Sequence, residues 1–269
     1  MDWVVFFTFV FMINNNPIGL FDSGIGGTSI WSEIHSLMPN EDTIYLADSK
    51  NAPYGLKSKS DILELCIKNT EFLLEKNAKI IVVACNTATT NAIKELRSIY
   101  KVPFIGIEPA IKPAAIHSNT HTIGILATKG TLTSELFNKS LEMYHDTKII
   151  EQIGHGLVEL IENGELNSSE MTRLLHLYVD PMIKENIDYL VLGCSHYPYL
   201  IPQLRRILPQ NIKIIDSGEA VARQTHNVLN NNIGLHEPGV GKALFYSNKD
   251  KKVLEEILNN HYEVIYEDF

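Results

Sequence analysis

The chain has 269 residues, of which 45% are hydrophobic and 20% charged, and its formal net charge is -9. This length allows two modest domains or one large one. An acidic chain without a basic cluster argues against binding to nucleic acid or to an anionic membrane surface. The three cysteines, Cys66, Cys85 and Cys194, are far apart, and neither their odd number nor their spacing is typical of a disulfide scaffold or a zinc site. Cys66 lies on an amphipathic face and is predicted to be a core residue.

The chain begins with an apolar segment from Trp3 to Ile13 that only Thr8 interrupts. It is shorter than the roughly 20 apolar residues that a membrane-spanning helix needs. No Lys or Arg precedes Lys50, so the positive start of a signal peptide is missing. Two interpretations stay open: residues 1–13 are a disordered or partner-binding extension, or the natural protein starts at Met12.

Short apolar runs alternate with amphipathic stretches along the rest of the chain. The runs are rich in Ile, Val and Leu, which is expected of strands buried on both faces of a parallel sheet. They are Ile18–Phe21, Thr43–Ala47, Ile80–Ala84, Pro103–Ile107, Thr122–Ala127, Tyr189–Gly193, Lys213–Ile215 and Ala243–Tyr246. Helical faces are predicted from Ile62 to Leu73 and from Met171 to Met182, and Pro181 is expected to kink or end the second. This alternation predicts an α/β fold with mainly parallel sheets.

Two pairs of segments resemble each other within the chain. Ile80–Thr87 and Tyr189–His196 each contain an apolar strand, a small residue, a Cys and two polar residues. Asp22–Gly24 and Asp216–Gly218 each carry Asp-Ser-Gly after an apolar run. These likenesses favour two related halves, although strand–turn–helix units can also look alike without a common origin.

We therefore predict two similar α/β domains that face each other across a cleft. The first comprises residues 14–107 together with the C-terminal stretch 221–269, and it carries Cys85. The second comprises residues 108–220 and carries Cys194.

Polar residues follow several of the predicted strands, where open parallel sheets bind their ligands. Cys85 ends a strand just before Asn86 and Thr87, which are good helix N-caps. A thiol at a helix N-terminus is favoured as thiolate, although a buried, inert Cys is the alternative. Cys194 occupies the same local position, and His196 is close enough to tune a thiol or bind an anion, unless it is a structural histidine.

Three loops are further candidates. The turn Asp22–Gly27 is rich in glycine and can present N–H groups to a carboxylate or phosphate. It matches neither a dinucleotide fingerprint nor a Walker A loop. The loop Asp48–Gly55 follows another strand. Thr128 and Thr131 flank Lys129-Gly130, where helix capping is the alternative to ligand binding.

In combination, these motifs resemble the glutamate racemases of the aspartate/glutamate racemase superfamily. The resemblance covers roughly residues 17–269 in family order, and the two cysteine motifs together are its most specific part. The matching segments are Gly19–Gly27, Asp48-Ser49, Pro53–Gly55, Ala84–Ala88, Gly106–Pro109, Thr128–Thr131 and Gly193–Pro198.

The resemblance implies that Cys85 and Cys194 act as acid and base on opposite faces of the substrate Cα. Asp22 and His196 would assist them, and Glu162 would aid catalysis on the second side. The residues implied to hold the substrate are Asp22, Ser23, Tyr54, Gly55, Asn86, Thr87, Thr128, Thr131, Ser195 and His196.

The implied enzyme is cytoplasmic and forms D-glutamate for peptidoglycan synthesis. Neither a metal nor another cofactor is expected. Glutamate is the expected partner, nucleic acid and membrane are not, and a homodimer is possible.

This sequence departs from the family pattern in places. Ser195 stands where Thr is usual, and Asn51 stands where Arg is common. The segment before Glu162 also differs, which makes the alignment of Glu162 the weakest.

Three other functions stay open. Aspartate racemase is the nearest, although His196 favours glutamate because the similar aspartate enzymes usually carry Glu there. The others are a hydrolase that uses Cys85 as nucleophile and a two-lobed protein that binds small anions without catalysis.

Overall fold

The computed structural model describes residues 13–269, so nearly all of the predicted N-terminal extension lies outside the described residues. The strands are β1 (Ile18–Asp22), β2 (Thr43–Ala47), β3 (Ile80–Val83), β4 (Phe104–Gly106), β5 (Thr122–Ala127), β6 (Lys148–Ile153), β7 (Tyr189–Gly193), β8 (Lys213–Ile215), β9 (Ala243–Ser247) and β10 (Val264–Tyr266). The α-helices are α1 (Thr28–Leu37), α2 (Lys59–Glu75), α3 (Asn86–Ile99), α4 (Ile111–His117), α5 (Lys129–Leu132), α6 (Glu135–Leu141), α7 (Leu157–Glu162), α8 (Ser169–Lys184), α9 (Ile201–Ile207), α10 (Gly218–Val228) and α11 (Lys252–Ile257). Short helical turns lie at η1 (Tyr54–Leu56), η2 (Tyr197–Leu200) and η3 (Leu229–Ile233).

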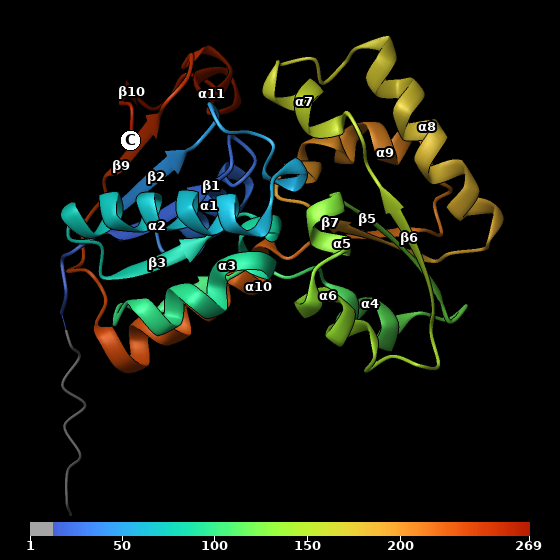
Figure 1. The fold of residues 1–269 in the computed structure, drawn as a ribbon, viewed down its shortest axis with the longest axis horizontal. Helices are drawn as coiled ribbons and strands as arrows, with labels where there is room; N and C mark the ends of the chain where they lie inside the picture. The colour runs from blue at the N-terminus through green and yellow to red at the C-terminus, as the bar shows by residue number, and fades with distance from the viewer. Residues whose placement is uncertain (1–12) are drawn as a thin grey trace, which may run out of the picture.

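The strands form two sheets in which every neighbouring pair is parallel. One sheet has the order β10-β9-β2-β1-β3-β4 and the other has the order β6-β5-β7-β8. Figure 1 shows them side by side, and we call the part built on the first sheet the first lobe and the part built on the second sheet the second lobe. The predicted α/β class with parallel sheets is confirmed, and each predicted apolar run coincides with a strand.

The two lobes share one strand order. The segment β2-β1-β3-β4 of the first sheet corresponds to the whole second sheet, β6-β5-β7-β8. Cys85 follows β3 and Cys194 follows β7, so the two cysteines occupy equivalent places in the two lobes. The fold therefore supports the likeness that the sequence shows around these two residues.

The likeness between the two Asp-Ser-Gly segments has a different origin. Asp22 ends β1, whereas Asp216 follows β8, and these strands are not equivalent in the shared order. In both segments the Asp carboxylate accepts a hydrogen bond from the Gly two residues later, at 3.1 Å for Gly24 and 2.8 Å for Gly218. The second likeness is therefore a local turn that occurs twice in the chain. The prediction that it indicates two related halves is wrong.

The central strands form because both of their faces are buried. Leu20 and Val82 face one hydrophobic cluster, while Phe21 and Ile81 on the same two strands face the other. Burying a large apolar side chain contributes about 1.5–3 kcal/mol, so this alternation stabilises the layered arrangement of helix, sheet and helix.

The C-terminal part of the chain returns to the first lobe. Strand β9 pairs with β2, and helix α10 packs against α1. The predicted limit at residue 221 lies inside α10, and the limits of the two domains stay a prediction.

Two further features of the helices bear on the sequence analysis. Helix α8 continues past Pro181 to Lys184, so of the two expected effects, a kink or an end, the end is wrong and the kink stays a prediction. Within residues 13–269, no helix is long and apolar enough to cross a membrane.

Candidate active site

The fold brings the carboxyl ends of four strands together between the lobes. In each sheet the second strand lies on one side of the first strand, and the third strand lies on its other side. A crevice therefore opens at the carboxyl ends of the first and third strands. Asp22 ends β1, Cys85 follows β3, Thr128 follows β5 and Cys194 follows β7. The resulting cavity is lined by Ser23, Pro53, Tyr54, Gly55, Cys85, Asn86, Thr87, Thr128, Val158, Cys194, Ser195 and His196.

Most of the predicted site residues line this cavity. Asp22, Thr131 and Glu162 instead lie behind its wall, where they contact residues of the lining. Sequence reasoning missed Val158, an apolar residue of α7 in the stretch that departs from the family pattern. Nothing in its residue type marks such a side chain as part of a site.

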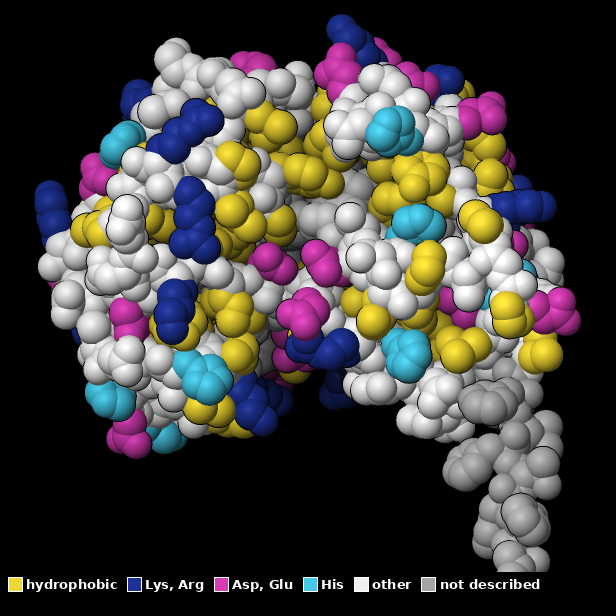
Figure 2. Space-filling view, turned by 180° about the vertical axis from the view of Figure 1, so that it is seen from behind, with side chains coloured by type: hydrophobic (Ala, Val, Ile, Leu, Met, Phe, Trp, Pro, Cys, Tyr) yellow, Lys and Arg dark blue, Asp and Glu magenta, His cyan; other side chains and the backbone are white. Residues whose placement is uncertain are grey.

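The cavity is nearly closed. Its volume is about 10 Å³, close to the space that one water molecule needs. Hydrogen bonds cross between the lobes beside it, from Ser29 Oγ to the Ser195 carbonyl at 2.9 Å and from Ser195 Oγ to Asp22 Oδ1 at 3.0 Å. A ligand larger than water therefore does not fit this closed arrangement of the lobes. In the space-filling view of Figure 2, the surface is notched between the two lobes.

Cys85 is itself the N-cap of α3, in place of the predicted Asn or Thr cap. Its Sγ accepts a hydrogen bond from Ala88 N at 3.4 Å and lies 3.7 Å from Ser23 Oγ. Burial nevertheless raises the pKa of the Cys85 thiol well above its usual value, and the charge of Asp22 raises it further. The hydrogen bond from the Ala88 N–H offsets only part of this increase in pKa. The expected preference for thiolate is therefore outweighed by desolvation, and Cys85 is a thiol in the closed protein.

Cys194 has a histidine as its neighbour. Its Sγ lies 3.8 Å from His196 Nδ1, and the other ring nitrogen of His196 lies 2.6 Å from Glu162 Oε1. Because a carboxylate only accepts hydrogen bonds, this contact assigns a proton to Nε2 of His196. Burial lowers the pKa of His196, but the hydrogen bonds to Cys194 and Glu162 and the charge of Asp22 raise it more, so it lies well above its usual value.

Glu162 connects the two lobes at the back of the site. It ends α7 of the second lobe, yet its Oε1 accepts a hydrogen bond from Ile25 N at 2.7 Å and its Oε2 accepts one from Ser49 Oγ at 2.8 Å, both from the first lobe. The glycine-rich turn thus does present an N–H group to a carboxylate, as expected of such a turn. This carboxylate belongs to the protein itself.

Asp22 lies between the turn and His196. Its two carboxylate oxygens accept hydrogen bonds from Ser195 Oγ and from Gly24 N, and Oδ2 is 4.0 Å from His196 Nδ1. Burial raises the pKa of Asp22, the charge of His196 lowers it, and the charge of Glu162 raises it. The net direction is upward, so its charge depends on the imidazolium beside it.

Hydroxyl groups form another part of the site. Thr128 Oγ1 lies 2.7 Å from Thr87 Oγ1 and 3.0 Å from Thr131 Oγ1. Thr128 also caps α5 through Thr131 N at 3.3 Å, so the capping interpretation is confirmed, while the same residue lines the cavity. The Tyr54 hydroxyl is hydrogen-bonded to the Asp48 carboxylate, which fixes its ring at the edge of the cavity.

Asn86 differs from the other polar residues of the lining. It is 2% exposed, and within the described chain neither its amide nitrogen nor its amide oxygen has a hydrogen-bond partner. An unpaired buried amide costs about 1–3 kcal/mol, so this side chain is available for a ligand at the expense of stability.

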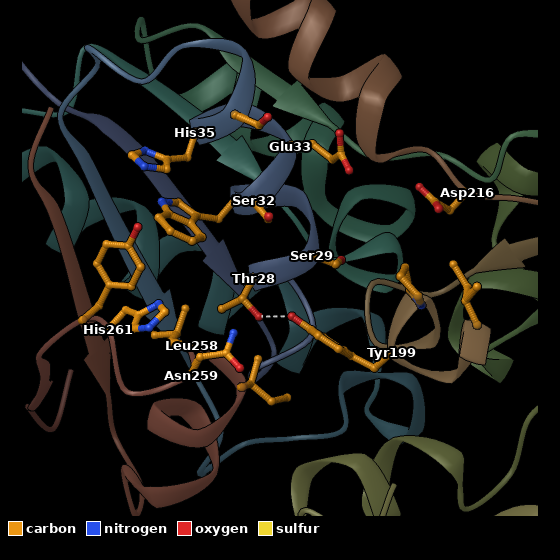
Figure 3. Close-up of a pocket in the computed structure, with 16 residues that line it drawn as sticks. Thr28, Ser29, Ser32, Glu33, His35, Tyr199, Asp216, Leu258, Asn259 and His261 are labelled. Atoms are coloured by element: carbon orange, nitrogen blue, oxygen red, sulfur yellow. Dashed lines mark hydrogen bonds between the residues drawn. The ribbon is translucent and has the colours of Figure 1, made fainter. Parts of the chain in front are cut away.

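A larger cavity, of about 640 Å³, lies away from the cysteines between α1, η2 and α11. Figure 3 shows Glu33 and Asp216 on one side of it, His35 and His261 on the other, and the 2.5 Å hydrogen bond between Thr28 and Tyr199. It contains neither thiol. No group of three or more His, Cys, Asp or Glu side chains among residues 13–269 is placed to hold a metal ion.

Comparison with known proteins gives consistent matches along the chain. The profile of the Asp/Glu/Hydantoin racemase family matches residues 27–225. A glutamate racemase of Pseudomonas putida (strain F1) is 44% identical over 244 residues, which cover 90% of this chain and 92% of the relative.

Solved structures match over nearly the whole fold. Glutamate racemase isoform RacE1 of Bacillus anthracis has a TM-score of 0.85 at 29% identity, and the match covers 95% of this chain and 98% of that one. The Escherichia coli glutamate racemase in complex with L-glutamate and the activator UDP-MurNAc-ala has a TM-score of 0.82 at 30% identity, covering 93% of this chain and 97% of that one.

Proposed function

Because this chain belongs to the Asp/Glu/Hydantoin racemase family and, within it, to the glutamate racemases, we propose that it interconverts L- and D-glutamate by proton transfer between Cys85, Cys194 and the substrate Cα. The observation that carries this proposal is the placement of the two thiols. They follow equivalent strands of the two lobes, and both line one cavity.

Racemisation requires that a proton leave one face of Cα and that another arrive at the opposite face. A thiolate on one face takes the α-proton, the electron pair stays on Cα, and the thiol on the other face gives its own proton to that carbon. Each turnover leaves the two cysteines with exchanged protonation states. Another turnover of the same enantiomer therefore requires proton exchange with solvent.

The surroundings of the thiols favour one resting arrangement. His196 with both ring nitrogens protonated directs a positive N–H toward Cys194 Sγ, an arrangement that suits the base of the reaction. Burial keeps the proton on Cys85. Cys194 is then the base and Cys85 the acid in the first turnover. The family resemblance assigns Cys194 to the L-enantiomer and Cys85 to the D-enantiomer.

The carbanion needs stabilisation by fixed dipoles in a site from which water is excluded. The free amide of Asn86 and the hydroxyls of Thr87 and Thr128 offer hydrogen bonds to substrate carboxylates. Closure of the lobes excludes water. The proposal includes no metal or other cofactor, and the product would supply D-glutamate for peptidoglycan synthesis.

Circular dichroism tests this function directly. Each glutamate enantiomer, incubated with the protein alone, is expected to lose its signal to the racemic value, and aspartate is expected to react far more slowly. A comparable rate on aspartate would favour the aspartate racemase alternative. A requirement for added pyridoxal phosphate, or no racemisation of either amino acid, would contradict the proposal.

The resemblance also implies a homodimer that acts in the cytoplasm. Light scattering coupled to gel filtration tests the first point, because a dimer has twice the 30.3 kDa mass of the chain. A monomer at every concentration would contradict it.

A further inference from the structure

The hydrogen bonds of Glu162 come mainly from the lobe to which it does not belong. The Ile25 N–H and the Ser49 hydroxyl of the first lobe donate to its two oxygens at 2.7 and 2.8 Å. Only the third donor, His196 Nε2 at 2.6 Å, belongs to the second lobe. Each carboxylate oxygen therefore has a partner from across the cleft.

Two glycines of the first lobe make room for this arrangement. A Cβ on Gly24 would lie 1.9 Å from Glu162 Oε1, and a Cβ on Gly26 would lie 2.2 Å from His196 Nδ1. Both distances are far shorter than real Cβ contacts. The turn is thus shaped to receive the Glu162 and His196 side chains of the second lobe.

From these contacts we infer that Ser49 is a positioning residue for the Cys194 side of the reaction: it holds the Glu162 carboxylate so that His196 keeps Nδ1 directed at Cys194 Sγ. The inference rests on the proposed function. A carboxylate that orients a functional histidine through one ring nitrogen fixes both the tautomer and the direction of the other nitrogen. Without the Ser49 hydroxyl, Oε2 of Glu162 is a buried oxygen without its donor, and only the Oε1 contacts with Ile25 N and His196 Nε2 still hold the carboxylate, so its orientation toward His196 is less firmly fixed.

The effect of Ser49 is limited to one thiol. The hydrogen-bonding neighbours of Cys85 are Ser23 Oγ and Ala88 N, and neither contacts Ser49 or Glu162 through a hydrogen bond. Loss of the Ser49 hydroxyl should therefore slow proton abstraction by Cys194 and leave abstraction by Cys85 nearly unchanged. Since Ser49 reaches Glu162 only while the lobes are in contact, the base on the Cys194 side is completed when the cleft closes.

Variants with a single catalytic cysteine separate the two sides. Cys85→Ser leaves Cys194 as the only thiol base, and Cys194→Ser leaves Cys85. With β-chloroalanine as probe, removal of the α-proton leads to a Cα–Cβ double bond as chloride departs with its electron pair, and the enamine hydrolyses to pyruvate and ammonia. Pyruvate formation from each enantiomer thus reports one base at a time.

Adding Ser49→Ala to both variants tests the inference. We expect elimination to become at least about tenfold slower in the Cys85→Ser background, which is the size expected for a lost hydrogen bond to a charged group. In the Cys194→Ser background the change should stay within about twofold. Ser49→Thr, which keeps the hydroxyl, should restore most of the rate.

Ser118→Ala is the matched control, because Ser118 Oγ also donates to a buried carboxylate, Asp188 Oδ1, at 2.6 Å and lies outside the site. It should leave elimination unchanged in both backgrounds.

Two outcomes would overturn the inference. Equal slowing by Ser49→Ala in both backgrounds would show that Ser49 has only a structural role, and no slowing in either background would show that it does not position Glu162. If Ser49→Ala fails to fold, Ser49→Gly carries the same comparison, because it also removes the hydroxyl and adds no thiol. If the single-cysteine variants eliminate from neither enantiomer, the proposed function fails before Ser49 is changed.

Discussion

The imidazole Nδ1 atom of His196 lies 3.8 Å from the Sγ atom of Cys194. Cys85 has instead a serine hydroxyl and a backbone N–H as its hydrogen-bonding neighbours. The two thiols therefore share a position in the fold but not an electrostatic environment. In the proposed reaction, this difference assigns proton abstraction on one face of the substrate to Cys194 and proton donation on the other face to Cys85.

The raised pKa of His196 predicts how the stability of the protein depends on pH. A group whose folded pKa lies above its unfolded value stabilises the fold fully below the unfolded value, about 6.5 for His, and loses this contribution as the pH rises through the folded value. The difference in Tm between the protein and a His196→Gln variant should thus be largest below about pH 6.5 and shrink as the pH is raised above it. Thermal unfolding followed by circular dichroism measures it. A difference that grows over this range would contradict the assigned protonation.

Gly24 offers a test of the contact between the lobes. In Gly24→Ala the new Cβ would take the place of the Glu162 carboxylate, which must turn away from His196. We expect kcat to fall at least about tenfold, because a hydrogen bond to a charged group is lost. Gly239→Ala serves as control, since the nearest atom to its new Cβ is 3.9 Å away. Equal activity of the two variants would show that the Gly24 turn does not matter for Glu162.

We predict that the Asn86 side chain lowers the stability of the unliganded protein and strengthens substrate binding. Because its buried amide has no partner among the described residues, Asn86→Ala should leave the Tm of the unliganded protein unchanged or raise it, while KM for glutamate rises. Asn69→Ala, which removes a buried amide that donates to Tyr54 at 3.1 Å, should instead cost about 1 kcal/mol of stability. A lower Tm with an unchanged KM for Asn86→Ala would mean that its role is structural.

The strands of the fold could be predicted where both faces are buried. The central run of β3, Ile80–Val83, consists only of Ile and Val because all four residues are buried. The edge strands β6 and β10 were missed. Lys148–Ile153 is half exposed and carries polar residues, and Val264–Tyr266 is only three residues long, so neither has the pattern of a buried strand.

The sequence allowed prediction of those residues of the candidate site that directly follow a buried strand. Cys85 and Cys194 were found because each ends a buried run just before polar residues. The contact of Ser49 with Glu162 joins residues 113 positions apart, and only the packing of the lobes decides it. The protonation of Cys85 was also beyond the sequence, because burial, which opposes the helix N-terminus, is a property of the closed fold.

The central claim is that each cysteine serves one face of Cα. Cys85→Ser and Cys194→Ser should each lower racemisation of glutamate by at least about 100-fold, because an alcohol is a much poorer base than a thiol at neutral pH. Both variants should still bind glutamate, since Ser keeps the shape of Cys and other residues hold the ligand.

The most direct measurement is pyruvate release from L- and D-β-chloroalanine by these two variants, since elimination needs only one base. We predict opposite preferences: Cys85→Ser, which retains Cys194, should act on the L-enantiomer, and Cys194→Ser, which retains Cys85, should act on the D-enantiomer. Elimination by both variants from the same enantiomer, or full racemase activity in either variant, would contradict the two-base account.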